Sequence, residues 1–423
     1  KSGRFGSTSA TIEVQSAGST GDEPPGTRYR RCQPMTPSRI RVEPSLLRRI
    51  NERRLLEHLQ THGPSSRAGL KRISGLTAPT VSKVVDALLE QGLLEEVEPT
   101  EPWIGRPGKL LRLAQRSAVV LGVLLDAGRC TVAVAGLDAR IDATRTRRFD
   151  TPGSYAELLD AVERECRTAL AGLEGTPQGV AVVVNGLINS ADQQVICCVN
   201  LHILDGRQPG RDLSERLGVG CRLLKGTAAL CLSERAAGGV ADRDNFAVLD
   251  MTTGLGLGAI AGGVVLSGHG GMAGEIGHVV VDPDGGLCGC GHRGCLETLA
   301  TDAAFARLVS LKIGRPLGHE EVRSVVADSP KLFTAEVEIV ARHLAMAASM
   351  AVTIFNPATL LLHSDLFLDS DERLDQVRSR LRDAALAASV RACQVTRTRS
   401  SKEQAAVAGI IHEITHAWAP SLR

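Results

Sequence analysis

The sequence lacks long apolar runs: no stretch reaches the roughly 18 residues that a membrane-spanning helix requires. The segment from Lys1 onward also lacks the apolar core of a signal peptide. The 11 cysteines among 423 residues are too sparse for a small disulfide-stabilised scaffold. These absences exclude an integral membrane protein and a disulfide-rich secreted domain, so we expect a cytoplasmic protein.

The composition excludes two further classes of protein. With 43% apolar and 23% charged residues, the chain is neither wholly disordered nor collagen-like. Residues 1–44 are the exception, because they are rich in Gly, Ser, Thr, Pro and Arg without apolar periodicity, and we expect them to be disordered. The net charge of +2 is unevenly divided, with +6 over residues 1–113 and −4 over the rest. A basic front on a mildly acidic body points weakly to a nucleic-acid partner.

Residues 45–89 have the pattern of three helices. An apolar stripe from Leu46 to Leu59 predicts the first helix, and a short second helix over 66–73 ends before Gly75. The third helix buries one face and begins with small, polar and basic side chains. The residues expected to approach DNA are Thr77, Pro79, Thr80, Ser82 and Lys83. This arrangement predicts a helix-turn-helix whose third helix enters the major groove, with a three-helix interaction module as the alternative.

The next segment favours DNA binding. Leu93–Glu95 and Leu110–Leu113 are predicted strands on either side of Gly105-Arg106-Pro107-Gly108. Such a pair would form a wing with Arg106 at its tip, and a guanidinium so placed suits a narrow, negatively charged minor groove.

From Val119 the chain alternates between apolar runs and amphipathic segments, which predicts an α/β body. The expected elements are strands over 119–125, 131–137, 179–184, 246–251 and 259–266, and a helix over 154–173. The glycine-rich turn Thr252–Gly258 either presents backbone N–H groups to an anion or is only a tight hairpin.

One histidine and three cysteines in the body have metal-ligand spacing: His278, Cys288, Cys290 and Cys295. Four such ligands make a closed tetrahedral zinc site, which is structural because no position remains for water. The alternatives are a group of unrelated buried cysteines, or His292 as a competing ligand with poor geometry beside Cys295. The other cysteines lack ligand spacing.

These motifs resemble the repressor, open-reading-frame and sugar-kinase (ROK) family over about residues 45–416. The blocks Glu275–His278 and Cys288–Glu297 are its most specific part. The resemblance implies two actin-like (ribonuclease H-like) lobes and assembly into dimers or tetramers. It also implies an effector site at Glu275, His278 and Glu297, because residues at these positions in the family's sugar kinases contact sugar hydroxyls, and the histidine is also a zinc ligand.

The sequence departs from the family's kinases at two motifs. Their phosphate-binding Asp-x-Gly-Gly-Thr is here Asp126-Ala127-Gly128-Arg129-Cys130, and Asn185-Gly186 replaces the usual Pro-Gly. Gly226 stands where the kinases carry the aspartate that acts as general base, a contribution of about 10²–10⁴ in rate. We therefore expect no enzyme activity. The same changes allow an alternative in which the pocket no longer binds sugars.

The sequence thus predicts an α/β protein with three parts: a disordered segment (1–44), a winged helix-turn-helix (45–115) and a two-lobed ROK body with a zinc-binding insertion at 278–297 (116–423). The expected function is a transcriptional repressor of carbohydrate-related genes that binds an inverted-repeat DNA operator as a homodimer or homotetramer. Its control would come from a sugar or sugar-phosphate effector or from a protein partner. A sugar kinase with a fused DNA module is the alternative.

A last motif is interpreted as a coincidence. His412-Glu413-Ile414-Thr415-His416 matches the HExxH pattern of zinc proteases, but only seven residues follow it, which leaves little room for a third ligand. We expect it to lie on the closing helix of the body.

Overall fold

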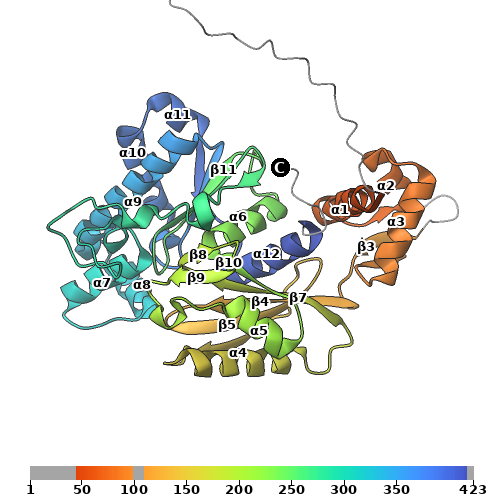
Figure 1. Cartoon of the computed structure of the whole chain (residues 1–423). Coiled ribbons are helices and arrows are strands. Elements are labelled where there is room, and N and C mark those ends of the chain that lie inside the picture. Colours follow the sequence, from red (N-terminus) through yellow and green to blue (C-terminus); the bar gives the residue numbers. More distant parts are fainter. Residues whose placement is uncertain (1–43, 99–108, 417–423) are drawn as a thin grey trace, which may run out of the picture. The chain divides into compact units, whose positions relative to one another are not determined.

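The computed structural model describes residues 44–98 and 109–416, and the front of this part contains three helices and a small sheet (Figure 1). The helices are α1 (Pro44–His62), α2 (Arg67–Ser74) and α3 (Ala78–Glu90). The antiparallel sheet has the order β1-β3-β2, from β1 (Ser65–Ser66), β2 (Leu94–Val97) and β3 (Leu110–Leu113). The three helices and the strand pair predicted from the sequence are therefore present. The predicted wing tip, with Arg106, lies outside the described residues.

Helix α3 forms where the sequence predicts it because its start is capped and one face is apolar. The Thr77 hydroxyl accepts a hydrogen bond from the backbone N–H of Thr80 at 3.4 Å. The side chains on the inner face are buried: Val81, Val84, Val85 and Leu88. Burial of this face fixes the rotation of α3, so the opposite face is turned to solvent.

The body contains two mixed five-stranded sheets. The first has the order β10-β7-β4-β5-β6. Its strands are β4 (Ala118–Leu125), β5 (Arg129–Gly136), β6 (Arg147–Asp150), β7 (Thr176–Val184) and β10 (Cys221–Lys225). Strands β4, β7 and β10 are parallel to one another, whereas β5 pairs antiparallel with β4, and β6 pairs antiparallel with β5. Helices α4 (Tyr155–Leu170) and α5 (Pro209–Leu217) cover one face of this sheet (Figure 1).

The second sheet has the order β13-β12-β11-β14-β15. Its strands are β11 (Phe246–Asp250), β12 (Gly256–Ala261), β13 (Val264–Val265), β14 (Thr359–His363) and β15 (Gln394–Arg397). Its core includes side chains from α7 (Asp302–Ile313), α8 (His319–Asp328), α9 (Thr334–Phe355) and α10 (Asp371–Ala384), and α11 (Ala387–Ala392) packs against α9 and α10. The strand expected over 259–266 is instead a hairpin, because Gly262 and Gly263 adopt φ of 57° and 78° and turn the chain between β12 and β13.

Two helices connect the sheets. Helix α6 (Gly226–Ala237) follows β10 and packs against strands of both sheets, and α12 (Lys402–His416) packs on α6 and on β4 and β7. The hairpin β8 (Leu187–Asn189) and β9 (Gln194–Cys197) follows β7. The ends of β7, β10 and β11 and the starts of α6 and α12 line the two cavities described below.

Within the described part of the chain, one segment, Pro330–Phe355, is long and apolar enough to cross a membrane by length and composition. The sequence analysis had expected no such segment, because polar residues interrupt its apolar runs. More than half of it is buried inside the protein, where Val340, Leu344 and Ala348 of α9 have no exposed surface. A helix buried in this way belongs to the protein's own core.

Glu95 of β2 organises the segment that follows β3. One of its carboxylate oxygens accepts hydrogen bonds from the backbone N–H groups of Gln115, Arg116 and Ser117 at 2.9–3.1 Å, and the other accepts from Arg112. Burial alone would raise the pKa of Glu95, but these backbone bonds and the Ser117 hydroxyl lower it to about 2. The negative charge is therefore tied to the folded state.

We predict that Glu95→Gln destabilises the protein by about 1–3 kcal/mol near neutral pH, because it replaces charge-assisted hydrogen bonds by weaker ones. Since the folded-state pKa lies below the unfolded one, the contribution is complete above about pH 4.5 and is lost as the pH falls toward 2. Denaturant unfolding of both proteins at pH 7 and pH 3 measures the difference. Equal destabilisation at both values would contradict the role of the charge.

Candidate metal centre and effector pocket

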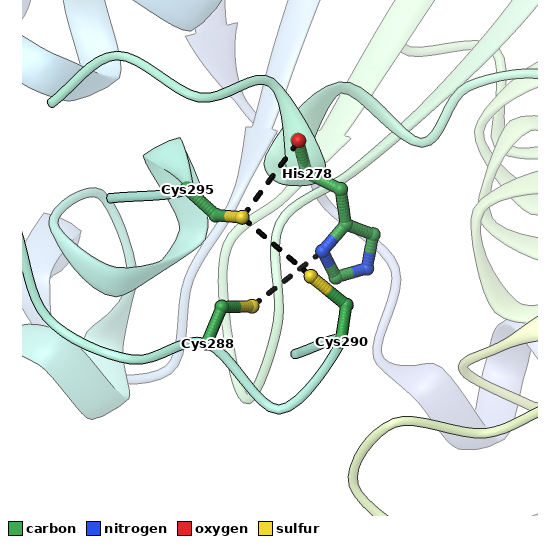
Figure 2. A group of neighbouring side chains, drawn as sticks. All are labelled: His278, Cys288, Cys290 and Cys295. Atoms are coloured by element: carbon green, nitrogen blue, oxygen red, sulfur yellow. Dashed lines mark hydrogen bonds between the residues drawn. The ribbon is translucent and has the colours of Figure 1, made fainter. Parts of the chain in front are cut away.

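The predicted zinc ligands converge on one point. His278 ends the short 3₁₀ helix Ile276–His278, Cys288 and Cys290 lie on the loop that follows, and Cys295 immediately precedes the 3₁₀ helix Leu296–Thr298. Figure 2 shows the four side chains directed toward one another, and their ligand atoms all lie within 4.8 Å of each other. This cluster can bind a metal ion.

The spacing of the donor atoms fits a tetrahedral zinc ion. The Cys288 Sγ lies 3.6 Å from the His278 Nδ1, and the Sγ atoms of Cys290 and Cys295 are 3.6 Å apart. With Zn–S bonds of about 2.3 Å, tetrahedral geometry places two sulfurs about 3.8 Å apart. A backbone hydrogen bond from the Cys288 N–H to the His292 carbonyl, at 2.8 Å, closes the loop around this point.

Cys290 has the acidity that a metal ligand needs. Burial raises its pKa, but hydrogen bonds from the backbone and side chain of His292 and from the other two thiols outweigh that effect and lower it to about 6. The His292 Nδ1 lies 3.6 Å from the Cys290 Sγ, yet His292 is not part of the group whose donor atoms converge. His292 therefore acts on a ligand thiol rather than completing the cluster.

A pocket lies beside the metal cluster, and the three residues expected to bind an effector, Glu275, His278 and Glu297, all line it. Further polar side chains complete the wall: Asn185 after β7, Asn200 after β9 and Lys225 at the end of β10. Of these, only Asn185 was named from the sequence. The lining thus combines carboxylates, amides, an imidazole and an ammonium group. Such a set can donate hydrogen bonds to a polyhydroxylated ligand and accept hydrogen bonds from it.

Two of the three expected effector residues already have partners within the protein. The Lys225 ammonium forms an ion pair with the Glu275 carboxylate and donates to the Ala273 carbonyl at 2.7 Å. Glu297 accepts a hydrogen bond from the Leu255 N–H at 3.0 Å, so the glycine-rich turn between β11 and β12 directs this N–H at a carboxylate of the protein. The antiparallel pairing of these strands makes the turn a hairpin.

Asn185 occupies the space beside Gly226. A Cβ atom built on Gly226 would lie 2.1 Å from the Asn185 Oδ1, which is far inside a van der Waals contact. A carboxylate at position 226 would therefore require Asn185 to move. The glycine and the asparagine are therefore a matched pair, with the amide oxygen of Asn185 in the space that a side chain at position 226 would need.

Lys402 lines a second cavity, of about 290 Å³, and brings a positive charge into it. Lys402 lies 3.3 Å from the Asp250 carboxylate and donates to the Thr252 hydroxyl, while the Thr253 hydroxyl donates to Asp126 at 3.2 Å. Burial lowers the pKa of Lys402, but Asp250, Asp126 and Asp365 together raise it above its usual value. Burial likewise raises the pKa of Asp250, and Lys402 leads the interactions that hold it below normal. Both groups are charged near neutral pH.

The comparison with known proteins identifies the body. The model of the ROK family matches residues 122–414, which is well over half of the chain. The chain belongs to the ROK family.

Relatives of this ROK protein include regulators of transcription. It is 25% identical to the DNA-binding transcriptional dual regulator NagC of Escherichia coli over 362 residues, which cover 81% of this chain and 87% of NagC. It is 22% identical to the xylose repressor of Bacillus subtilis, covering 80% and 88% of the two chains.

Solved structures confirm the ROK fold of the body. A ROK family transcriptional regulator described as a homologue of the E. coli Mlc protein superposes with a TM-score of 0.73 at 23% identity, over 87% of this chain and 97% of that one. A ROK glucokinase from Streptomyces griseus, solved with glucose and AMPPNP, superposes with a TM-score of 0.62 at 21% identity, over 69% and 97% of the chains.

The structure also locates the other residues named from the sequence. Thr77, Pro79 and Lys83 are exposed at the start of α3, whereas Thr80 and Ser82 are half-buried there. The HExxH motif lies on α12, as expected, but its members make internal contacts. Glu413 forms an ion pair with Arg222, and His412 lies 3.4 Å from an Arg235 nitrogen, so His412 is half-buried rather than exposed.

Sequence analysis missed Lys402 and the role of Lys225. Nothing near Ser401-Lys402-Glu403 indicates a partner, because Asp250 lies 152 positions earlier in the chain. Lys225 directly precedes Gly226 in the chain, but the sequence motifs gave it no role. A cation at the junction of a strand and a helix, beside a family motif, is the signal that should have directed attention to it.

We predict that the purified protein holds about one tightly bound zinc per chain and that Cys290→Ser loses it. The folded protein should become less stable as well, because structural zinc contributes folding free energy. Metal analysis and thermal unfolding after dialysis against a weak chelator measure both effects. Cys221→Ser, which alters another half-buried free thiol, is the matched control. Wild-type protein without zinc would overturn the assignment.

Proposed function

We propose that this ROK protein is a DNA-binding transcriptional regulator that represses carbohydrate-related genes. The observation that carries the proposal is the front of the chain, where α2, a turn at Gly75, α3 and the antiparallel pair β2–β3 precede a ROK body. This order of elements is typical of a winged helix-turn-helix. The names of the relatives NagC and xylose repressor support the same function.

The start of α3 has the properties of a recognition helix. Thr77, Pro79 and Lys83 are exposed, and the hydroxyl groups of Thr77 and Thr80 contact each other at 2.8 Å, so they form one polar surface. Small residues there allow close approach to the floor of the major groove, and a hydroxyl group can contact base edges. We assign base contacts to Thr77, Thr80 and Ser82, close packing to Pro79, and a phosphate contact to Lys83.

The charges around this helix suit a polyanion. Lys71 and Arg72 are exposed on α2, and neither has an ion-pair partner among residues 44–98 and 109–416. Arg67, by contrast, is neutralised by Asp86 at 2.8 Å. We therefore add Lys71 and Arg72 to the phosphate-contacting set, and we keep Arg106 as the proposed minor-groove contact of the wing.

We further propose that the pocket lined by Glu275, His278 and Glu297 receives a sugar-type effector that controls operator binding. Two carboxylates and an imidazole that line one pocket suit several directed contacts to hydroxyl groups. An effector must first displace Lys225 from Glu275, or contact both. The second candidate is control by a protein partner without a small molecule. If no sugar binds, the ion pair between Lys225 and Glu275 favours this second candidate.

A sugar kinase is the less favoured function. Its general base is missing at Gly226, and Asn185 occupies the adjacent space. In the second cavity, where the family's kinases would hold nucleotide phosphate, the bulky Arg129 replaces the motif's glycine, and the Lys402 ammonium is already paired with Asp250. We therefore propose a non-enzymatic, cytoplasmic regulator that binds zinc and acts on an inverted-repeat operator as a homodimer or homotetramer.

The DNA-binding proposal predicts different effects for two substitutions in α3. Thr80→Ala should relax sequence preference, at about 1–3 kcal/mol if the hydroxyl contacts a base, and it retains the backbone N–H that Thr77 caps. Lys83→Ala should weaken binding to all sequences and reduce the salt slope by about 1. Selection from random DNA, followed by affinity measurements over a range of salt concentrations, separates them. Lys331→Ala, at an exposed position on the body, is the control. If wild-type protein selects no sequence, the proposed function is wrong.

The effector proposal predicts a gain of affinity in Lys225→Asn. Loss of the ammonium group frees the Glu275 carboxylate for a sugar hydroxyl, so neutral sugars should bind about tenfold more tightly, or 1.4 kcal/mol. Calorimetry with glucose, xylose and N-acetylglucosamine measures this, with Arg222→Gln on the same strand as control. If neither protein binds any sugar, a partner-controlled regulator is favoured instead.

A further inference from the structure

A second group of metal-ligating side chains lies outside the zinc cluster. The Cys197 thiol, the His202 ring and the Asp205 carboxylate place one donor atom each within 4.8 Å of the others. Cys197 ends β9, His202 begins the 3₁₀ helix His202–Leu204, and Asp205 follows that helix directly. None of the three belongs to the cluster of His278 and its cysteines.

The donors are held in place by the surrounding backbone. Asp205 accepts a hydrogen bond from the Cys198 N–H at 2.6 Å through one oxygen, and its other oxygen lies 2.9 Å from the His202 Nδ1. Val195 of β9 exchanges backbone hydrogen bonds of 2.9 Å with Gly206 and Arg207, which brings the far end of the segment back to the strand. The buried Leu204 anchors the helix between them. The backbone therefore holds the three side chains close together, and a bound ion would replace the contact between His202 and Asp205.

The kind of donor decides which ions fit. A thiolate, an imidazole and one carboxylate suit Zn²⁺ and similar transition-metal ions, whereas Mg²⁺ and Ca²⁺ prefer all-oxygen sites. Three protein ligands leave at least one coordination position open, unlike the four-ligand zinc cluster. The His202 and Asp205 side chains are 62% and 37% exposed, so an ion there can exchange with solvent.

We propose that Cys197, His202 and Asp205 form a second, exchangeable binding site for a zinc-like transition-metal ion. Cys197 also lines the pocket of Glu275, His278 and Glu297, and Asn200, on the segment between the ligands, lines it too. The ion would thus bind in the wall of that pocket. The proposal concerns metal binding alone and does not depend on the identity of the effector.

The competing explanation is an ordinary surface ion pair. His202 and Asp205 are three positions apart, and an exposed pair of this kind stabilises a protein only weakly and without any metal. That explanation gives the thiol of Cys197 no role. A substitution at Cys197 therefore distinguishes the two.

The test is zinc stoichiometry in the full chain. After equilibrium dialysis against buffered micromolar Zn²⁺, wild-type protein should hold about two zinc ions per chain, and dialysis against a weak chelator should remove one. Cys197→Ser, His202→Ala and Asp205→Asn should each hold about one throughout, and Cys221→Ser should behave as wild type. Asp205→Asn retains an oxygen for the Cys198 N–H, so it guards against a loss of folding. One zinc in wild type, or two in the three variants, would overturn the site.

Discussion

An ion pair between Lys402 and Asp250 joins the two sheets of the body. Lys402 begins α12, which packs on the first sheet, and Asp250 ends β11 in the second. A charge buried alone is unfavourable, and removing one member of such a pair leaves the other uncompensated, at about 3–5 kcal/mol. The position of α12 is therefore coupled to the end of β11, and with it to the turn that directs the Leu255 N–H at Glu297 in the neighbouring pocket.

The same kind of internal pairing occurs in the two cavities described above. In each one, a lysine of the chain occupies a place suited to a ligand group: Lys402 beside Asp250 and Lys225 beside Glu275. The protein thereby satisfies its carboxylates internally. A regulator needs a ligand that changes its conformation, not one that reacts, so an internal cation that a ligand must displace is compatible with control.

Sequence reasoning succeeded at α3 and at the metal cluster, where the determining residues are close together in the chain, although it missed the turn at Gly262 and Gly263. The apolar spacing of Val81, Val84, Val85 and Leu88 predicted the buried face of α3, and the spacing of His278 and the three cysteines predicted a convergent metal cluster. It failed where partners are distant. Lys225 and Glu275 are 50 positions apart, and the contact of Asn185 with Gly226 depends on the packing of β7 beside β10. Local patterns carry no information about such pairs.

His278 shows how the metal cluster and the pocket depend on each other. Its Nδ1 faces the Cys288 thiol at 3.6 Å, and its Nε2 lies 3.9 Å from the Glu275 carboxylate on the pocket side. A metal ion bound at Nδ1 requires that nitrogen to be unprotonated, which places the proton of the neutral ring on Nε2. The imidazole then presents a donor to the pocket with its orientation fixed by the metal. The Lys225 ammonium contacts the other oxygen of Glu275, so the nearer oxygen and a ligand in the pocket would compete for this N–H. If zinc binds the cluster, its removal would therefore alter the pocket without any substitution in the residues that line it.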